Sequence, residues 1–319
     1  MYGCTADIPE RTVSLCSPMP EGRACATVFV ADGKAYVFAG RDASGKALND
    51  LWCYSPETDI WTDLGTTPLS PRVNATACVC GSEVYLGLGF NGRYGTDSAY
   101  MRDWWQFVPA TNSWIRLADY PNSYTDRAAS FASDGAVYAG YGFCWNYRRD
   151  MFRYDIPANR WDTVDTGASY KGYPVRSFGG CGAVCRGEIY FGTGYYRNSL
   201  DWWARLQCSQ NDPATEVPEY EWKRCRTVPG RTRTLAACAA TDSFIYLCGG
   251  THFGGVNTTG EVLCDIVRYD PDTDTWKTVG VMPQRLMNHV CFAIGKTVYF
   301  GLGENENLQT TNALYKIEE

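Results

Sequence analysis

The most regular pattern of apolar and polar positions is a short apolar run that contains a tyrosine and ends at a glycine four residues after that tyrosine. The pattern occurs six times, and successive tyrosines lie 49, 53, 52, 56 and 53 residues apart. Repeats of this length that each expose an apolar face must pack against their neighbours to bury it. The pattern therefore predicts six repeats closed into a β-propeller. The copies are Tyr36/Gly40, Tyr85/Gly89, Tyr138/Gly142, Tyr190/Gly194, Tyr246/Gly250 and Tyr299/Gly303.

Each repeat is predicted to hold four antiparallel strands, which makes the fold class all-β. Turn pairs such as Asp32-Gly33 separate the tyrosine run from a preceding apolar run, as in a hairpin. After a variable loop an aspartate opens a third strand. An aromatic residue follows four positions later, and a tryptophan seven positions after that. In the fourth repeat Arg205 stands at the expected aromatic position and Trp222 follows 17 residues later, so we expect a loop extension of about ten residues there.

The two ends of the chain predict how the propeller closes. Val13 precedes Pro20 by seven residues, the spacing that separates the tryptophan of other repeats from a proline. Tyr315 stands at the third-strand aromatic position, and the chain stops four residues later. The segment around Arg11–Leu15 is therefore expected to supply the outer strand of the sixth blade, which removes an open sheet edge. We expect a single domain over residues 1–319.

These residues resemble the kelch repeat family over essentially the whole chain. The glycine-ended second strand and the aromatic-x6-Trp spacing carry the resemblance, although among the six second-strand ends only Gly249-Gly250 is a true diglycine. The resemblance implies a six-bladed kelch propeller. It implies no particular activity, because one fold hosts many functions.

Composition excludes some classes of partner. The formal net charge of −6 argues against nucleic acid, and no apolar stretch is long enough to span a membrane. The 15 cysteines show no zinc-site spacing, so we expect free thiols, with a disulfide framework as the alternative. The start Gly3-Cys4 resembles the processing point of a bacterial lipoprotein, which would place the protein in the periplasm or on the cell surface. The apolar leader of such a signal is absent. We expect a monomer.

The loops between the second and third strands contain the unusual chemistry. They combine aromatic, asparagine and arginine residues, which suit sugar rings or peptide backbones. The alternative is that these side chains only pack the loops together. The predicted ligand-binding residues in these loops are Arg41, Arg93, Tyr94, Trp145, Tyr147, Arg148, Tyr195, Tyr196, Arg197, His252 and Phe253.

An arginine also stands at or near the start of each inner strand. Six such side chains around one channel would concentrate positive potential on a carboxylate. The alternative is that each arginine ties strand ends together. The residues are Arg23, Arg72, Arg127, Arg176, Arg231 or Arg233, and Arg285.

Three functions are compatible with the sequence. The favoured one is a non-catalytic propeller that binds a glycan, in particular an acidic sugar, or a protein segment on the loop side. The second rests on similarity to bacterial sialic acid epimerases (mutarotases), where the resemblance implies a glutamate after a second-strand glycine for proton transfer and a nearby arginine for the carboxylate. Glu304 has the place of the glutamate here, and Gln309 stands where the arginine would help, so Arg23 or Arg285 is expected to supply it. The third, least favoured, rests on similarity to galactose oxidase, a copper radical oxidase, and would require both His252 and His289 as ligands. We expect no cofactor.

Overall fold

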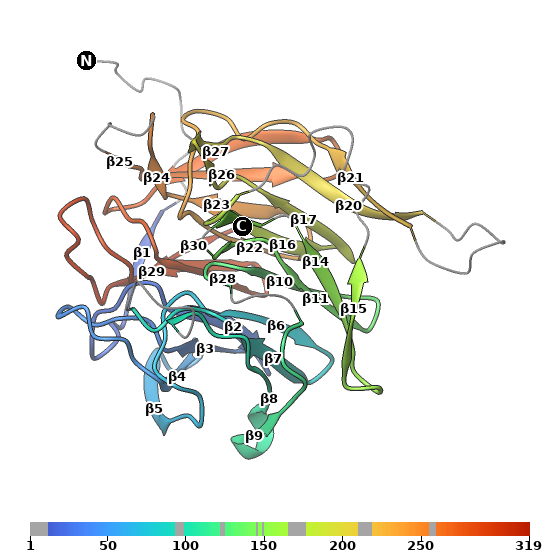
Figure 1. Ribbon diagram of the computed structural model, residues 1–319. Coiled ribbons are helices and arrows are strands. Elements are labelled where there is room, and N and C mark those ends of the chain that lie inside the picture. Colours follow the sequence, from blue (N-terminus) through green and yellow to red (C-terminus); the bar gives the residue numbers. More distant parts are fainter. Residues whose placement is uncertain are drawn as a thin grey trace.

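Six four-stranded antiparallel sheets surround a central channel in the computed structural model (Figure 1). The structure describes residues 12–92, 99–121, 125–144, 146–148, 150–164, 177–209, 219–254 and 260–319. The first strands of successive blades contact one another all the way around the channel, from β2 through β6, β10, β16, β22 and β28 back to β2. The predicted six-bladed, all-β propeller is therefore confirmed.

The strands follow the predicted order within each blade. Blades 1 to 3 comprise β2 (Thr27–Ala31), β3 (Lys34–Phe38), β4 (Asp50–Ser55) and β5 (Ile60–Thr66); β6 (Thr76–Cys80), β7 (Glu83–Gly87), β8 (Trp104–Val108) and β9 (Ser113–Arg116); and β10 (Ala129–Ser133), β11 (Ala136–Gly140), β14 (Met151–Asp155) and β15 (Arg160–Val164). Blades 4 to 6 comprise β16 (Cys181–Cys185), β17 (Glu188–Gly192), β20 (Trp203–Ser209) and β21 (Glu219–Arg224); β22 (Ala237–Ala240), β23 (Ile245–Cys248), β26 (Asp265–Asp270) and β27 (Thr275–Val281); and β28 (Val290–Ile294), β29 (Thr297–Gly301), β30 (Leu314–Glu318) and β1 (Ser14–Cys16).

Smaller elements decorate this framework. The 3-10 helix η2 (Pro109–Thr111) joins β8 to β9, and no helix of the described residues is long and apolar enough to cross a membrane. Three short ladders extend the loops between second and third strands: β12 (Phe143–Cys144) with β13 (Asn146–Tyr147), β18 (Tyr195–Tyr196) with β19 (Asn198–Ser199), and β24 (Thr251–His252) with β25 (Glu261–Val262).

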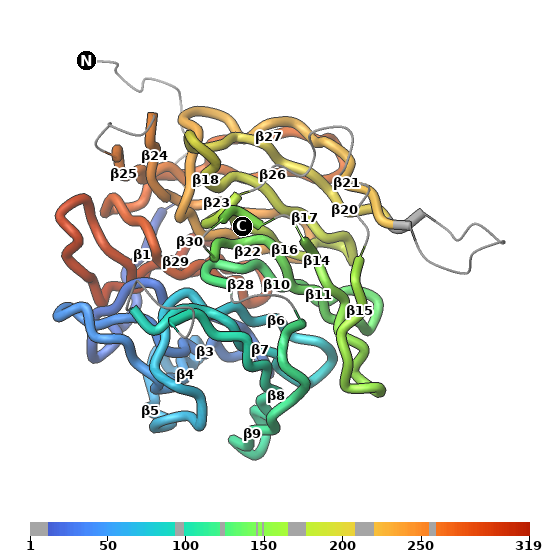
Figure 2. The backbone as a smooth tube through the Cα atoms, in the orientation of Figure 1, coloured from blue at the N-terminus to red at the C-terminus, as the bar shows by residue number. Residues whose placement is uncertain are grey.

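The N-terminal strand closes the propeller, as predicted. Strand β1 pairs antiparallel with β30, and Figure 2 shows it beside the red strands of the last blade. The closing strand is Ser14–Cys16, and Arg11 lies outside the described residues. The ladder places Ile317, not Tyr315, at the position of Tyr54. The prediction for Tyr315 is therefore wrong by two residues.

Blade 4 differs from the prediction in the register of its third strand, and its third and fourth strands form a long hairpin. Trp203 pairs with Gly192 as Leu51 pairs with Phe38, so Leu206 takes the place of Tyr54. The prediction for Arg205 is wrong by one residue, because the cross-strand ladder, not the distance from Asp201, sets the register. Strands β20 and β21 remain paired as far as Ser209 and Glu219.

The repeated glycine is required by the backbone at the end of each second strand. The φ angles of the six glycines lie between 83° and 98°. At Gly40 a Cβ atom would lie 2.7 Å from the carbonyl oxygen of Ala24. Glycine alone fits this left-handed, crowded position, which turns the chain toward the loop side.

Aromatic pairs fill most of the interfaces between blades. The tyrosine of one second strand packs on the third-strand aromatic residue of the next blade, and these contacts bury area and align ring edges against ring faces. Ring centroids are 5.6–6.1 Å apart in the pairs Tyr36–Phe107, Tyr85–Tyr154, Tyr190–Tyr269 and Tyr299–Tyr54.

Candidate functional site

The site begins where the inner strands start, at the end of the central channel that faces the loops between second and third strands. We call this side of the propeller the loop face. One residue from each blade forms the rim of the channel here, and each has a left-handed φ between 51° and 63°. Backbone hydrogen bonds join neighbouring blades, for example from Asn74 N to Cys25 O at 2.9 Å. A cavity of about 170 Å³ lies within this channel mouth. The six rim residues are Cys25, Asn74, Arg127, Gly179, Leu235 and Asn288.

Two buried carboxylates lie beside the channel mouth, each held by an arginine and an asparagine. Glu304 is 1% exposed, forms an ion pair with Arg41, and accepts a hydrogen bond of 2.7 Å from Asn288 Nδ2. It lies directly after Gly303, in the loop between the second and third strands of blade 6.

The second carboxylate is Asp126, which is 2% exposed. It forms an ion pair with Arg127 and accepts a hydrogen bond of 2.8 Å from Asn74 Nδ2. Burial raises the pKa of the Asp126 carboxyl, although the charge of Arg127 opposes that rise. Each arginine of the channel mouth thus has its own carboxylate, so the mouth is polar but close to neutral.

An aromatic patch adjoins the channel mouth on blades 3 to 5. Its rings are half-buried and contact one another in sequence across the blade boundaries. Tyr147 packs edge-on against Tyr196 with ring centroids 5.1 Å apart. The guanidinium of Arg127 lies 5.4 Å from the ring centroid of Phe178 and so joins the patch to the channel mouth. The patch consists of Phe143, Tyr147, Phe178, Tyr195, Tyr196 and Phe253.

The arginines predicted to line the channel occupy different environments. Arg23 is 0% exposed and Arg72 is 1% exposed, and each binds the aspartate that opens its third strand, Asp50 or Asp103. Burial works against ionisation of these two aspartates, but the hydrogen bonds and charge of the arginines outweigh it, so the pKa of each carboxyl is lowered. The structural alternative therefore describes Arg23 and Arg72, and we do not include them in the site.

In blade 5, Arg233 is 0% exposed and binds Asp265 in the same way as Arg23 binds Asp50, whereas Arg231 forms an ion pair with Glu261. The predicted arginines of blades 3, 4 and 6 are not equivalent to Arg23. The position of Arg23 is taken by Thr125 in blade 3, by Ser177 in blade 4 and by Leu286 in blade 6, as the ladder beside each one shows. Arg127 lies two residues later, on the channel mouth. Arg285 is exposed and donates to the carbonyl oxygen of Val262 at 2.7 Å.

The other predicted residues lie on the loop face around the patch. Arg197 is exposed, with its guanidinium 5.6 Å from the ring centroid of Tyr196. Arg148 lies 3.7 Å from a carboxylate oxygen of Asp150 in its own blade. His252 Nδ1 lies 2.9 Å from the hydroxyl of Thr232. The predicted residues Arg93, Tyr94, Trp145 and Arg176, and also Cys4, lie outside the described residues.

The two histidines do not form a metal centre with other ligands in the part of the chain that the structure describes. His289 lies in the wall of the channel, and burial lowers its pKa to about 4. No group of three or more histidine, cysteine, aspartate or glutamate side chains is placed to hold a metal ion among the described residues.

Several residues of the site were not predicted. These are Asn74, Asp126, Asn288, Phe143 and Phe178. The blades can be aligned on the residue at the start of each inner strand (Ala26, Ala75, Ala128, Gly180, Ala236 and His289). This alignment places Asn74 and Asn288 one position before it, on the channel mouth, and Asp126 and Phe178 two positions before it. Phe143 lies in the loop between second and third strands, so the alignment does not place it.

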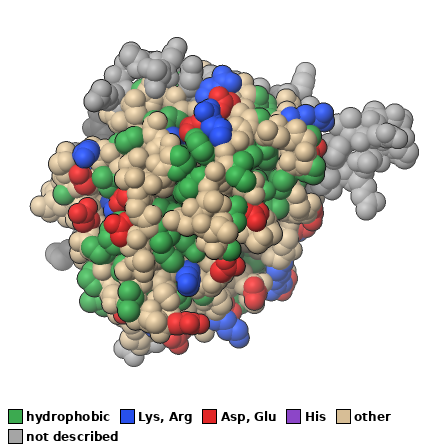
Figure 3. Space-filling view, turned by 90° about the horizontal axis from the view of Figure 1, so that it is seen from below, with side chains coloured by type: hydrophobic (Ala, Val, Ile, Leu, Met, Phe, Trp, Pro, Cys, Tyr) green, Lys and Arg blue, Asp and Glu red, His purple; other side chains and the backbone are tan. Residues whose placement is uncertain are grey.

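Charges on the surface do not form a large patch of one sign on the face drawn in Figure 3. Acidic and basic side chains are interspersed there among hydrophobic ones. This argues against strong attraction of anions to the face drawn, and the paired arginines argue against it at the channel mouth.

Comparison with known proteins agrees with the architecture. Residues 8–194 match the KLHDC2/KLHL20/DRC7 Kelch-repeats domain, and residues 232–283 match the Kelch motif. Mouse Kelch-like protein 35 is 26% identical over 269 residues, which cover 83% of this chain and 40% of that protein. Human Kelch-like protein 23 is 24% identical over 267 residues, which cover 81% of this chain and 42% of that protein.

The chain thus spans about two fifths of the length of these relatives. The solved structure of YjhT matches with a TM-score of 0.76 and 14% sequence identity, covering 95% of this chain and 97% of that one, so the two share a fold. The six glycine-ended repeats and the matched family describe the same molecule: this chain belongs to the kelch repeat family.

Proposed function

We propose that the loop face binds a segment of a partner protein, with the aromatic patch as the main contact surface. The observation that carries this proposal is the contiguous patch of six half-buried aromatic side chains beside a polar channel mouth. Aromatic side chains supply much of the energy of protein interfaces and lose little conformational freedom on binding. Kelch domains bind protein partners, and the match to a Kelch-repeats domain therefore also supports the proposal.

The geometry favours a protein segment over a glycan. A sugar stacks on the open face of an aromatic side chain, whereas Tyr147 and Tyr196, and likewise Tyr195 and Phe253, meet at interplanar angles of 88°. Rings packed edge to face in this way present a mixed surface of edges and hydroxyl groups, which suits side chains and backbone. The pairing of Arg41 and Arg127 with carboxylates removes the positive potential expected for an acidic sugar.

Paired variants test this proposal. Tyr147→Ala combined with Tyr196→Ala removes two rings of the patch, while Ile60→Ser changes an exposed apolar side chain on an outer strand. A partner protein that co-purifies with the wild-type protein should also co-purify with Ile60→Ser but not with the double variant. Once purified, that partner should bind the double variant at least tenfold more weakly than the wild type (about 1.4 kcal/mol). Equal binding by all three proteins would refute the proposal.

A second candidate is a sugar mutarotase, which the pair Glu304–Arg41 favours. A buried glutamate next to an arginine at the channel mouth is the combination that the resemblance to sialic acid epimerases calls for. Arg41 supplies the arginine here, instead of Arg23 or Arg285. Opening a hemiketal requires a general acid and base, and Glu304 would serve if substrate displaced its contacts with Arg41 and Asn288.

NMR of freshly released N-acetylneuraminate tests this second candidate. The protein should accelerate the relaxation of the anomers, and Glu304→Gln should abolish the acceleration. An unchanged relaxation rate with the wild-type protein would end this candidate and leave the protein-binding proposal untouched.

A further inference from the structure

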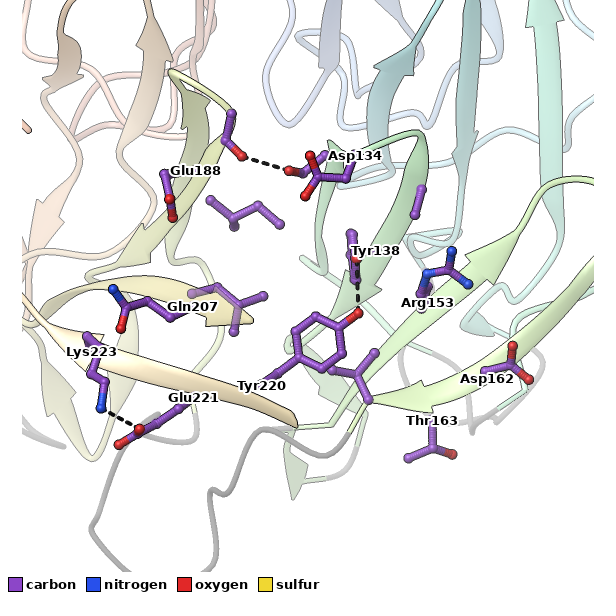
Figure 4. Close-up of a pocket in the computed structure, with 16 residues that line it drawn as sticks. Asp134, Tyr138, Arg153, Asp162, Thr163, Glu188, Gln207, Tyr220, Glu221 and Lys223 are labelled. Atoms are coloured by element: carbon purple, nitrogen blue, oxygen red, sulfur yellow. Dashed lines mark hydrogen bonds and ion pairs between the residues drawn. The ribbon is translucent and has the colours of Figure 1, made fainter. Parts of the chain in front are cut away.

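A cavity of about 940 Å³ opens between blades 3 and 4, and none of its lining residues belongs to the channel mouth or the aromatic patch (Figure 4). Its lining includes Ser133, Asp134 and Gly187 from the turns between first and second strands, which lie on the opposite side from the loop face. We propose that this cleft is a second binding site, which accepts an uncharged aromatic side chain carried by a partner segment. The proposal does not depend on the function proposed for the loop face.

One cause of the cleft is that blade 4 lacks a ring that most other blades supply. Tyr36, Tyr85, Tyr190 and Tyr299 each pack on an aromatic residue of the next blade. Tyr138 meets Leu206 at the equivalent position. A leucine is shorter and narrower than a tyrosine or phenylalanine, so the volume next to Tyr138 is only partly filled.

A comparison with the interface between blades 5 and 6 supports this explanation. There Ile317 also replaces the aromatic residue, but Phe244 packs into the same apolar cluster and compensates. The residue equivalent to Phe244 beside the cleft is Ala136, which adds almost no volume. Among the described residues, the interface between blades 3 and 4 thus has an aliphatic side chain at both of these positions.

Tyr220 from the long hairpin of blade 4 compensates in part. Its ring centroid lies 6.0 Å from that of Tyr138, and the two hydroxyl oxygens are 3.3 Å apart. Tyr220 lies on the outer strand β21 and is half-buried, so it lines the cavity without filling it. The two tyrosines in Figure 4 therefore form one wall of a slot, and Leu206 lies among the residues that line it.

The chemistry of the lining selects an uncharged ring. The buried lining residues Ala136, Val164 and Ile189, with Leu206, are apolar. The lining has four acidic and two basic side chains, but basic side chains lie beside three of the acids, with Lys223 next to Glu221, Arg160 next to Asp162 and Arg205 next to Glu188. The cleft therefore has hydrogen-bonding groups but little unpaired charge. The volume lies in the range of ligand-binding pockets and accommodates a ring together with the backbone that carries it.

Two neutral probes test the proposal, N-acetyl-L-tyrosine amide and N-acetyl-L-leucine amide, titrated into the purified protein and followed by NMR. The tyrosine probe should bind roughly tenfold more tightly than the leucine probe. Leu206→Phe should fill the slot from within and weaken the tyrosine probe by at least a similar factor. Ala136→Phe copies Phe244 and provides the same test if Leu206→Phe fails to fold.

Two matched variants serve as controls. Leu206→Met keeps a side chain of similar volume, and Tyr147→Ala changes only the aromatic patch, so both should bind the tyrosine probe as the wild type does. Equal affinity for the two probes, full binding by folded Leu206→Phe and Ala136→Phe, or loss of binding in Tyr147→Ala would each overturn the proposal. A dimer that the tyrosine probe dissociates would assign the cleft to a second copy of the chain and would overturn it as well.

Discussion

His289 is the one large side chain among six equivalent positions at the channel mouth, the others being Ala26, Ala75, Ala128, Gly180 and Ala236. It is 7% exposed, and neither ring nitrogen has a hydrogen-bond partner among the described residues. Gly249 of the neighbouring blade leaves room for it, since a Cβ there would lie 3.2 Å from its Cε1 atom. Burial keeps this imidazole neutral.

This burial predicts a pH dependence of stability. The pKa of His289 is lowered to about 4 in the folded protein, so between that value and its unfolded pKa of about 6.5 the unfolded chain binds the additional proton. The contribution of His289 is complete above pH 6.5 and is lost as the pH falls toward 4, which amounts to about 3 kcal/mol. Denaturant unfolding at pH 7 and at pH 4.5 should therefore differ less in His289→Ala than in the wild type. The same difference in both proteins would contradict this account.

The buried arginine–aspartate pairs are predicted to contribute measurably to the free energy of unfolding. Removing Arg72 alone leaves Asp103 charged and poorly solvated, so Arg72→Leu should lower the free energy of unfolding by about 3–5 kcal/mol. Blade 6 has Leu286 and Ala313 at these positions and needs no ion pair. The double variant Arg72→Leu/Asp103→Ala should recover most of the loss in the same denaturant experiment. Strictly additive losses would show that the two side chains do not stabilise each other.

Part of the site could be predicted at the residue scale. Glu304, Tyr147 and Tyr196 lie on the loop face because the preceding glycine fixes where each loop begins, and their part in binding or catalysis stays a prediction. The arginines were not separated, because a shift of two residues moves the side chain from the buried position of Arg23 to the channel mouth of Arg127. Only the pairing between strands sets that register.

At the scale of secondary-structure elements, the hairpin of first and second strands could be predicted because the residues that define it lie close together in the sequence. A turn pair, an apolar run and a glycine lie within a few residues of one another, and each has a conformational reason. The third strands were harder, since variable loops precede them. In blade 4 the variable loop led to the prediction of Arg205 at the third-strand aromatic position, where the structure has Leu206. Leu206 is also one of the residues that line the cleft.

The closing strand allows a matched test at this scale. Cys16 is buried against blades 1 and 6, whereas the adjacent Leu15 is 66% exposed. Cys16→Asp should lower the free energy of unfolding by about 3 kcal/mol because it buries a carboxyl without a partner, and Leu15→Asp should change it by no more than about 0.5 kcal/mol. Chemical denaturation of both variants measures this. Similar effects would mean that β1 does not pack as described.

The molecule as a whole presents two separate surfaces on one rigid framework. The loop face gathers residues from all six blades around the channel, while the cleft belongs to a single interface that lacks aromatic filling. The two proposed binding sites lie where the blades differ in sequence. The propeller fold arises from the features that all six blades share. The single-domain organisation and the monomeric state stay predictions.

Hydrogen exchange in the presence and absence of a purified partner tests the central claim most directly. The account predicts slower exchange at Phe143–Tyr147, Phe178 and Tyr195–Tyr196 on binding, with the outer strands β5 and β9 unchanged. Protection confined to the outer strands, with none on the loop face, would contradict it.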